Sequence, residues 1–184
     1  MIKDICHYKP SRLKTKMEIM LKGEFVKLFI FQGLNSDQLD LLAPLVNVCN
    51  YAPETTIFKQ GQHATHLYIL LRGQVEIRFK PYDGPPLTVS RMKTGDVFGW
   101  SSTLGREVYT SSAISVTESE AYCISGTALH ELCELHPDAG VVILEKLASA
   151  IAERLEATHA EIMNILSQGM ELGEQHSGKG NSND

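Results

Sequence analysis

A chain of 184 residues with a formal net charge of −5 and a pI near 5.8 has an ordinary soluble composition. Its length suits one domain with an appended helix, and it can bury a full core. The acidic balance argues against a nucleic-acid-binding surface, which is usually basic. No apolar run approaches the roughly 18 residues of a membrane span, and the N-terminus lacks an apolar signal-peptide core. We therefore expect a cytoplasmic protein with no membrane partner.

The first part of the chain predicts a polar arm followed by helices. Residues 1–17 are polar with a basic excess, and we expect an N-terminal arm there. From Glu18 the apolar residues are spaced for one face of a helix. A short amphipathic helix is expected next, with Asn35 or Ser36 as its N-cap. Residues 18–137 are predicted to form the main domain, which includes these N-terminal helices.

From Val48 onward the pattern changes from helices to short strands. These segments alternate apolar and polar residues or form short apolar runs, and Pro, Gly and Asn separate them. The expected strands are 48–51, 55–58, 67–71, 75–79, 87–89, 113–116 and 121–124. About eight short strands at this spacing favour an antiparallel barrel or jelly roll. The predicted fold class is therefore mainly β with flanking helices, a double-stranded β-helix (jelly-roll) barrel followed by a long C-terminal helix.

Cysteine and histidine positions match no metal or redox motif. None of the four cysteines has a two-residue spacing to another: Cys6, Cys49, Cys123 and Cys133. We expect all four to be reduced, with those in the two strand-like runs acting as small core residues. His63 and His66 could contact a metal on a helix, but before a strand they are expected at the surface. No motif of a known catalytic site is present, so we predict no enzyme and no metal site. Haem ligation stays an open alternative without a recognisable axial-ligand pattern.

A long C-terminal helix is predicted over residues 138–172, with Asp138 as a cap. Its apolar positions alternate spacings of four and three, which is the seam of a two-stranded coiled coil. The seam consists of Leu144, Ala148, Ile151, Leu155, Thr158, Ile162 and Ile165. The alternative is a helix that packs only on its own barrel. We predict a homodimer through this helix and a disordered Gly/Ser/Asn-rich tail at 173–184.

The order of several motifs resembles that of cyclic-nucleotide-binding domains. The segments 57–61, 67–75 and 95–99 follow one another as the successive signatures of that family do, and the resemblance covers roughly residues 25–165. Three of their glycines fall at predicted turns, where a positive φ is cheap only for glycine. The resemblance implies a sensor domain like those of the catabolite-activator family of regulators. No helix-turn-helix segment follows, so we expect no DNA binding by this chain alone.

The phosphate-binding cassette implied by this resemblance lacks its two charged ligands. In the family, Phe-Gly-Glu precedes a later Arg-Thr/Ser-Ala; the Glu holds the ribose and the Arg holds the cyclic phosphate. Here Trp100 stands at the Glu position and Ser111 at the Arg position, while Arg106 could lend its guanidinium or be a solvated loop residue. The candidate pocket residues are Phe98, Gly99, Trp100, Ser101, Ser102, Arg106, Ser111, Ser112, Ala113, Thr158 and His159.

The altered cassette changes the expected ligand. Trp100 has one N–H donor and no acceptor, so it could fill the pocket or stack on a planar ligand. We expect cyclic AMP to bind poorly or not at all, and leave open a cyclic nucleotide or another small ligand bound atypically. The predicted function is a regulatory small-molecule sensor domain. The alternative is a ligand-free dimeric interaction module that binds a protein partner.

Overall fold

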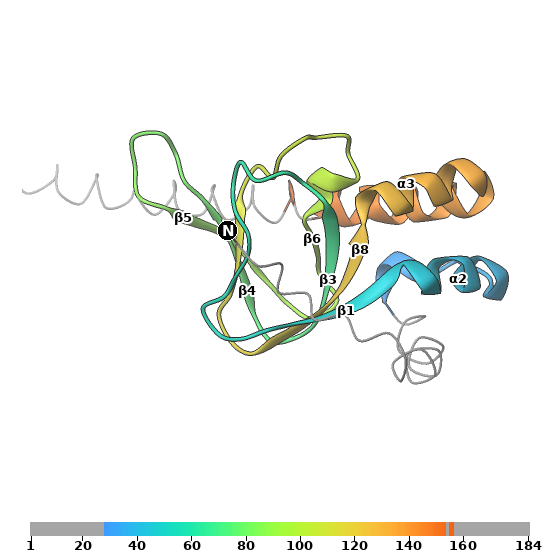
Figure 1. The fold of residues 1–184 in the computed structure, drawn as a ribbon, viewed down its shortest axis with the longest axis horizontal. Helices are drawn as coiled ribbons and strands as arrows, with labels where there is room; N and C mark the ends of the chain where they lie inside the picture. The colour runs from blue at the N-terminus through green and yellow to red at the C-terminus, as the bar shows by residue number, and fades with distance from the viewer. Residues whose placement is uncertain (1–27, 154, 157–184) are drawn as a thin grey trace, which may run out of the picture. The chain divides into compact units, whose positions relative to one another are not determined.

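The computed structural model describes residues 28–153, 155 and 156 (Figure 1). A β barrel and its flanking helices lie within the first of two compact units, Met1–Ala150. The predicted arm at 1–17 and the tail at 173–184 lie outside the described residues. The predicted domain boundaries therefore stay predictions.

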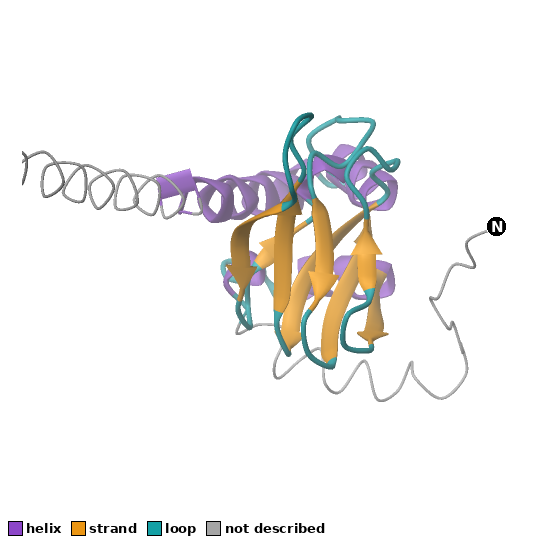
Figure 2. Ribbon diagram, turned by 90° about the vertical axis from the view of Figure 1, so that its left-hand side faces the viewer, coloured by secondary structure: helices purple, strands orange, loops and turns teal. Residues whose placement is uncertain are grey.

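Eight strands of the described residues form two four-stranded antiparallel sheets. One sheet has the order β1-β8-β3-β6 and the other the order β2-β7-β4-β5. The strands are β1 Val46–Tyr51, β2 Thr56–Phe58, β3 His66–Arg72, β4 Val75–Phe79, β5 Leu87–Met92, β6 Val97–Phe98, β7 Ser112–Ser115 and β8 Ser119–Ser125. Figure 2 shows strands of one sheet side by side in front, with helices at the top and behind them. The arrangement confirms the predicted mainly β jelly roll.

The two sheets bury their side chains differently because only one of them is covered by helices. Figure 1 shows α2 and α3 on the side of β1, β8, β3 and β6, with the β4–β5 hairpin on the opposite side. In β3 the run from Leu67 to Leu70 is buried throughout. In β4 the side chains of Val75 and Ile77 are buried, and the alternating residues face outward. Strand β4 therefore turns Glu76 and Arg78 toward the outer side of the second sheet.

Helix α2, Ser36–Leu42, begins at an N-cap formed by Asn35. The side chain of Asn35 accepts a hydrogen bond from the Gln38 backbone N–H at 2.9 Å, and the Gln38 side chain accepts one from the Asn35 N–H at 3.0 Å. This reciprocal pair is a capping box and confirms the predicted N-cap. Two 3₁₀ turns flank the helix, η2 Phe29–Phe31 and η3 Ala43–Leu45.

Two helices follow the last strand, and the sequence predicted only the second. Helix α3, Gly126–Leu135, begins after Ser125, whose hydroxyl accepts a bond from the Ala128 N–H at 3.4 Å. The next helix covers residues 137–153. Asp138 lies inside its first turn, so its predicted role as the cap is wrong.

The N-terminal helices pack on the helix at 137–153. The Gln38 amide donates to the Asp138 carboxylate at 2.9 Å, and this bond is the main reason that the pKa of Asp138 lies below its usual value. The ammonium of Lys146 lies 4.8 Å from the ring centroid of Phe29, within the range of a cation–π contact. These contacts tie the first and last described helices of the unit together.

The expectation that Cys49 and Cys123 are reduced is wrong. The structure joins them in a disulfide, with Cα atoms 6.3 Å apart. The register of β1 and β8 places Cys49 opposite Ala121, two residues from Cys123, so both side chains lie on one face of neighbouring strands. Both residues are buried, as expected of core positions. Their separation of 74 residues gave no sign of the pairing.

The predicted turn glycines take the backbone conformation expected of them. Gly61, Gly73 and Gly95 have φ values of 78°, 91° and 92°. At Gly73 an added Cβ would also overlap the carbonyl oxygen of Glu118. Gly73 therefore serves both a left-handed turn and a close approach of two backbones.

Candidate functional site

Gly99 sets the geometry at the start of the cassette. It follows β6, has φ 76° and ψ 18°, and precedes the 3₁₀ turn η4, Trp100–Ser102. An added Cβ would lie 2.8 Å from the carbonyl oxygen of His66 and from Tyr68 Cδ2. Only glycine fits this position, because both its φ and its surroundings exclude a side chain. The turn η4 is thereby held against the start of β3.

The hydroxyl groups of η4 are used within the turn. Ser102 Oγ donates to the Gly99 carbonyl at 3.1 Å, and Thr103 Oγ1 donates to the Trp100 carbonyl at 2.9 Å. Ser101 is buried and Trp100 is half-buried. On the other side, an added Cβ at Gly126 would overlap the Ser102 carbonyl. The turn is therefore wedged between β3 and the start of α3.

The loop that follows η4 pairs with the turn between β2 and β3. The Ala64 N–H donates to the Glu107 carbonyl at 2.8 Å, and the Tyr109 N–H donates to the Gln62 carbonyl at 2.9 Å. A further bond runs from the Gly61 N–H to the Tyr109 carbonyl at 2.8 Å. These bonds fix the path of the loop and leave Tyr109 at a defined place in the barrel.

Tyr109 points into the barrel and is 2% exposed. Its hydroxyl donates to the His66 carbonyl at 2.9 Å and accepts from the N–H groups of His66 at 3.0 Å and Thr65 at 3.3 Å. Its ring stacks on Phe58, with centroids 3.8 Å apart and 16° between the planes. The side chain is therefore held by both its polar end and its ring.

Tyr109 belongs to a group of four buried aromatic residues, which we call the aromatic cluster: Phe58, Tyr68, Phe98 and Tyr109. The ring centroids of Phe58 and Tyr68 are 5.6 Å apart, and those of Tyr68 and Phe98 are 5.1 Å apart. Among residues 28–153, 155 and 156, the buried polar residues are Gln38, Ser101, Ser115 and Ser119. No buried residue in this range is cationic. A phosphate entering this interior would meet rings rather than a balancing positive charge.

The predicted pocket residues divide into three groups. Phe98, Ser101 and Ala113 are buried beside or within the core; Gly99, Trp100, Ser102, Ser111 and Ser112 are half-buried; and Arg106 is exposed. Ser112 Oγ already accepts a bond from the Gln60 N–H at 2.9 Å. Thr158 and His159 lie outside the described residues. The roles proposed for these residues stay predictions.

Sequence reasoning missed Phe58 and Tyr109 as residues of the cassette interior. Phe58 was recognised as part of a strand and of the family segment 57–61, but not as a neighbour of the cassette. A tyrosine in a polar loop has no apolar periodicity that would mark it as buried. The one available signal was the large aromatic side chain of Tyr109 among the small and polar residues of the cassette.

The predicted dimer seam is partly described. Leu144 is 49% exposed and Leu155 is 70% exposed, Ala148 is exposed and Ile151 is half-buried. Ile143 and Leu147, on another side of the same helix, are each 1% exposed. The remaining seam residues, Thr158, Ile162 and Ile165, lie outside the described residues.

The described residues contain neither a cluster of metal-binding side chains nor a helix that could span a membrane. His63 is exposed and His66 half-buried, and that part of the chain holds no group of three or more metal-binding side chains. No helix in it is both long and apolar enough to cross a membrane.

The two antiparallel sheets, the glycine-led turn η4 and the loop across the end of the barrel define a jelly-roll domain. Residues 48–136 match the cyclic nucleotide-binding domain family, so this part of the chain is a domain of that type.

Proteins similar to this chain share between 17% and 28% of its sequence in the comparisons below. A CRP-like cAMP-activated global transcriptional regulator from Mycobacterium tuberculosis is 28% identical over 137 residues, which cover 74% of this chain and 59% of the relative. The chain thus spans less than two thirds of that regulator. The catabolite activator protein of Thermus thermophilus is 25% identical with a TM-score of 0.61, covering 76% of this chain and 63% of that one. A cyclic nucleotide-binding domain from Methylobacillus flagellatus has a TM-score of 0.70 at 17% identity, covering 82% and 84%.

Proposed function

We propose that this chain is a non-catalytic regulatory sensor domain whose cassette no longer recognises cyclic AMP. The family match and the transcriptional regulators among its relatives support the regulatory role. The observation that carries the altered specificity is Tyr109, a buried aromatic side chain where the cassette loop enters the barrel. Its hydroxyl is already committed to the backbone of β3. The ligand we propose is a small molecule that does not require the two charged groups missing at Trp100 and Ser111.

The expected loss of affinity for cyclic AMP follows from the missing charges. Charge-assisted hydrogen bonds are worth about 1.5–3 kcal/mol each. Losing the two that the family supplies, at Trp100 and Ser111, corresponds to about two to four powers of ten in affinity. Burying a phosphate beside aromatic rings adds a desolvation penalty that nothing offsets. Arg106 is exposed, and solvent screens any help from its guanidinium.

Calorimetric titration with cyclic AMP tests this proposal. We expect no micromolar binding by the wild type and a gain of about tenfold or more by Trp100→Glu/Ser111→Arg, which places both charges at the positions that carry them in the family. Trp100→Gln/Ser111→Gln is the matched comparison, because it changes the same two positions without adding charge. Tyr109→Ser, which opens the interior without adding charge, should stay weak. Micromolar binding by the wild type contradicts the proposal.

Signal output is proposed to involve the helix at 137–153. Its inner side, at Ile143 and Leu147, is buried, whereas Leu144 is half exposed to solvent. We propose that the exposed side continues into the homodimer seam. A ligand with different affinities for two positions of this helix would shift the equilibrium between them. A dimer that contains no ligand and binds a protein partner through the same module is the second candidate, and the ring-filled interior favours it.

DNA binding by this chain alone is not part of the proposed function. The formal net charge of −5 opposes binding to a phosphate backbone. A mobility-shift assay at physiological salt should show no sequence-specific complex. A retained complex that resists competitor DNA is the contrary result.

A further inference from the structure

A groove lies on the outer face of the sheet β2-β7-β4-β5, opposite to the barrel interior. Its volume is about 520 Å³, which is within the range of small-molecule sites. The walls come from β2 and the turn after it, from β7, and from the tip of the β4–β5 hairpin. Its lining residues are Thr56, Lys59, Gln60, Lys80, Pro81, Tyr82, Ser112 and Ile114.

The groove combines two positive charges with an apolar surface. Lys59 and Lys80 are its charged lining residues, and no acidic residue lines it. Neither lysine forms an ion pair with an acidic side chain of the described residues. Tyr82 is 99% exposed, so its ring is available for stacking, and Pro81 and Ile114 add apolar surface. The lining therefore suits an anion attached to a flat apolar body.

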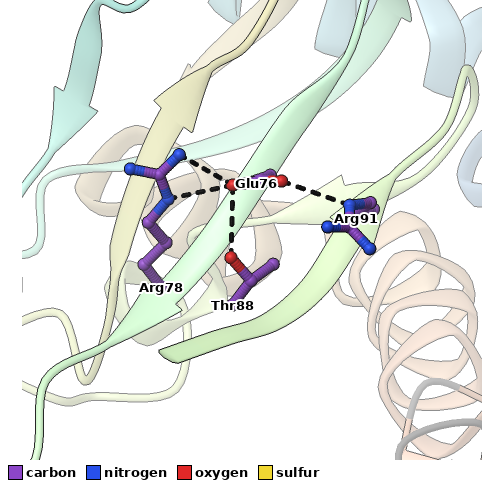
Figure 3. Close-up of polar contacts among 4 residues, drawn as sticks. All are labelled: Glu76, Arg78, Thr88 and Arg91. Atoms are coloured by element: carbon purple, nitrogen blue, oxygen red, sulfur yellow. Dashed lines mark hydrogen bonds and ion pairs between the residues drawn. The ribbon is translucent and has the colours of Figure 1, made fainter. Parts of the chain in front are cut away.

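Glu76, on the outer face of strand β4, is paired with two arginines. Glu76 lies opposite Ile114 in the β4–β7 ladder and is held from both sides (Figure 3). Arg78 Nη2 lies 2.8 Å and Thr88 Oγ1 3.2 Å from one carboxylate oxygen, and Arg91 Nε lies 3.1 Å from the other. Hydrogen bonding from Arg78 is the main cause that lowers the pKa of Glu76. The carboxylate of Glu76 and the guanidinium groups of Arg78 and Arg91 together carry a net positive charge.

The walls of the groove are tied together before any ligand arrives. The Gln60 side-chain amide donates to the Lys80 carbonyl at 3.1 Å, and the Lys80 N–H donates to Gln60 Oε1 at 2.9 Å. The Gln60 N–H donates to Ser112 Oγ at 2.9 Å. These three bonds connect the β2 turn, the hairpin and β7. A preformed site loses less conformational entropy on binding.

We propose that this groove is a second ligand site, distinct from the barrel interior, for a small planar aromatic carboxylate or phosphate. Lys59 and Lys80 hold the anionic group, and the ring lies against Tyr82, Pro81 and Ile114. The groove shares strand β7 with the cassette, because Ser112 lines the groove while its neighbour Ala113 is buried in the barrel. The site does not depend on what the barrel interior binds.

Heteronuclear NMR titrations of the full chain with phenyl phosphate, benzoate, inorganic phosphate and phenol test the site. We expect phenyl phosphate or benzoate to shift the amide signals of Lys59, Gln60 and Tyr82, with millimolar affinity as suits so small a probe. The stronger of the two identifies the anionic group. Phenol has the aromatic ring without the anionic group, and inorganic phosphate has the anionic group without the ring. Each should bind several-fold more weakly than the better of the two aromatic anions. Shifts elsewhere, or equal binding of inorganic phosphate, contradict the proposal.

Matched variants separate this site from general electrostatics and from the barrel. Lys59→Glu/Lys80→Glu should weaken binding of the anionic aromatic probe about tenfold or more, because two attractive charges become repulsive. Lys93→Glu/Arg106→Glu makes the same charge change at exposed positions outside the groove and should leave affinity within about twofold. An equal loss in both variants overturns the proposal. Trp100→Ala, in the cassette turn and outside the groove lining, should not alter probe binding, so failure of the barrel proposal and failure of this one are distinguishable.

Discussion

Replacing Tyr109 by Phe tests the role of its hydroxyl with the smallest change available. The ring can still stack on Phe58, 3.8 Å away between centroids. The lost hydroxyl makes three hydrogen bonds to the backbone of Thr65 and His66. A buried polar group left without its partner costs about 1–3 kcal/mol. Because one carbonyl and two N–H groups lose a partner together, we expect a loss of about 2–3 kcal/mol in the free energy of unfolding.

Urea unfolding followed by circular dichroism measures this loss directly. For a chain of this length, it corresponds to a fall of about 4–12 °C in melting temperature. Tyr82→Phe is the matched control, since Tyr82 is 99% exposed and surface changes usually stay within about 0.5 kcal/mol. If Tyr109→Phe is as stable as this control, the hydroxyl does not anchor the cassette loop and the reasoning is refuted.

Three further predictions concern stability, pH dependence and assembly. Gly73→Ala should lower the free energy of unfolding by more than about 2 kcal/mol, because backbone strain and steric overlap act together there. Gly61→Ala has open space around it and should lower the free energy of unfolding by about 1 kcal/mol, from backbone strain alone. Equal losses for the two variants in urea unfolding contradict this prediction. The pKa of Glu76 is lowered in the folded state from 4.5, so its stabilisation is present above that pH and is lost as pH falls through the folded pKa. The stability deficit of Glu76→Gln in urea should therefore shrink on acidification, and a constant deficit is the contrary result. Ile151→Glu/Leu155→Glu should convert the homodimer to monomer in sedimentation, and an unchanged dimer would exclude this seam.

Local signals in the sequence account for most of the strands and for the capped helix. Period-two alternation in β4 and the Asn35–Gln38 capping box each involve residues within a few positions of one another. Positive φ at Gly73 and Gly95 likewise follows from their place in turns between strands. Such features are predictable because short-range geometry determines them.

Features that depend on the register between distant strands were not predictable in the same way. The Cys49–Cys123 disulfide arises only once β1 and β8 are paired. Burial of Tyr109 depends on the loop crossing to the β2–β3 turn, and its hydroxyl bonds to backbone 43 residues away. Helix α3 was missed because it is only 10 residues long and follows a strand directly. Trp100 and Ser111 were assigned to the positions of the charged ligands by resemblance to a sequence motif. A sequence motif does not show which side chains are buried.

A crystal structure of the wild-type chain grown with millimolar cyclic AMP tests the central claim most directly. The account predicts that Tyr109 keeps its hydrogen bonds to Thr65 and His66, that its ring remains stacked on Phe58, and that the barrel interior holds no nucleotide. Cyclic AMP bound between η4 and β7, with Tyr109 displaced or its phosphate contacting the cassette, would contradict it.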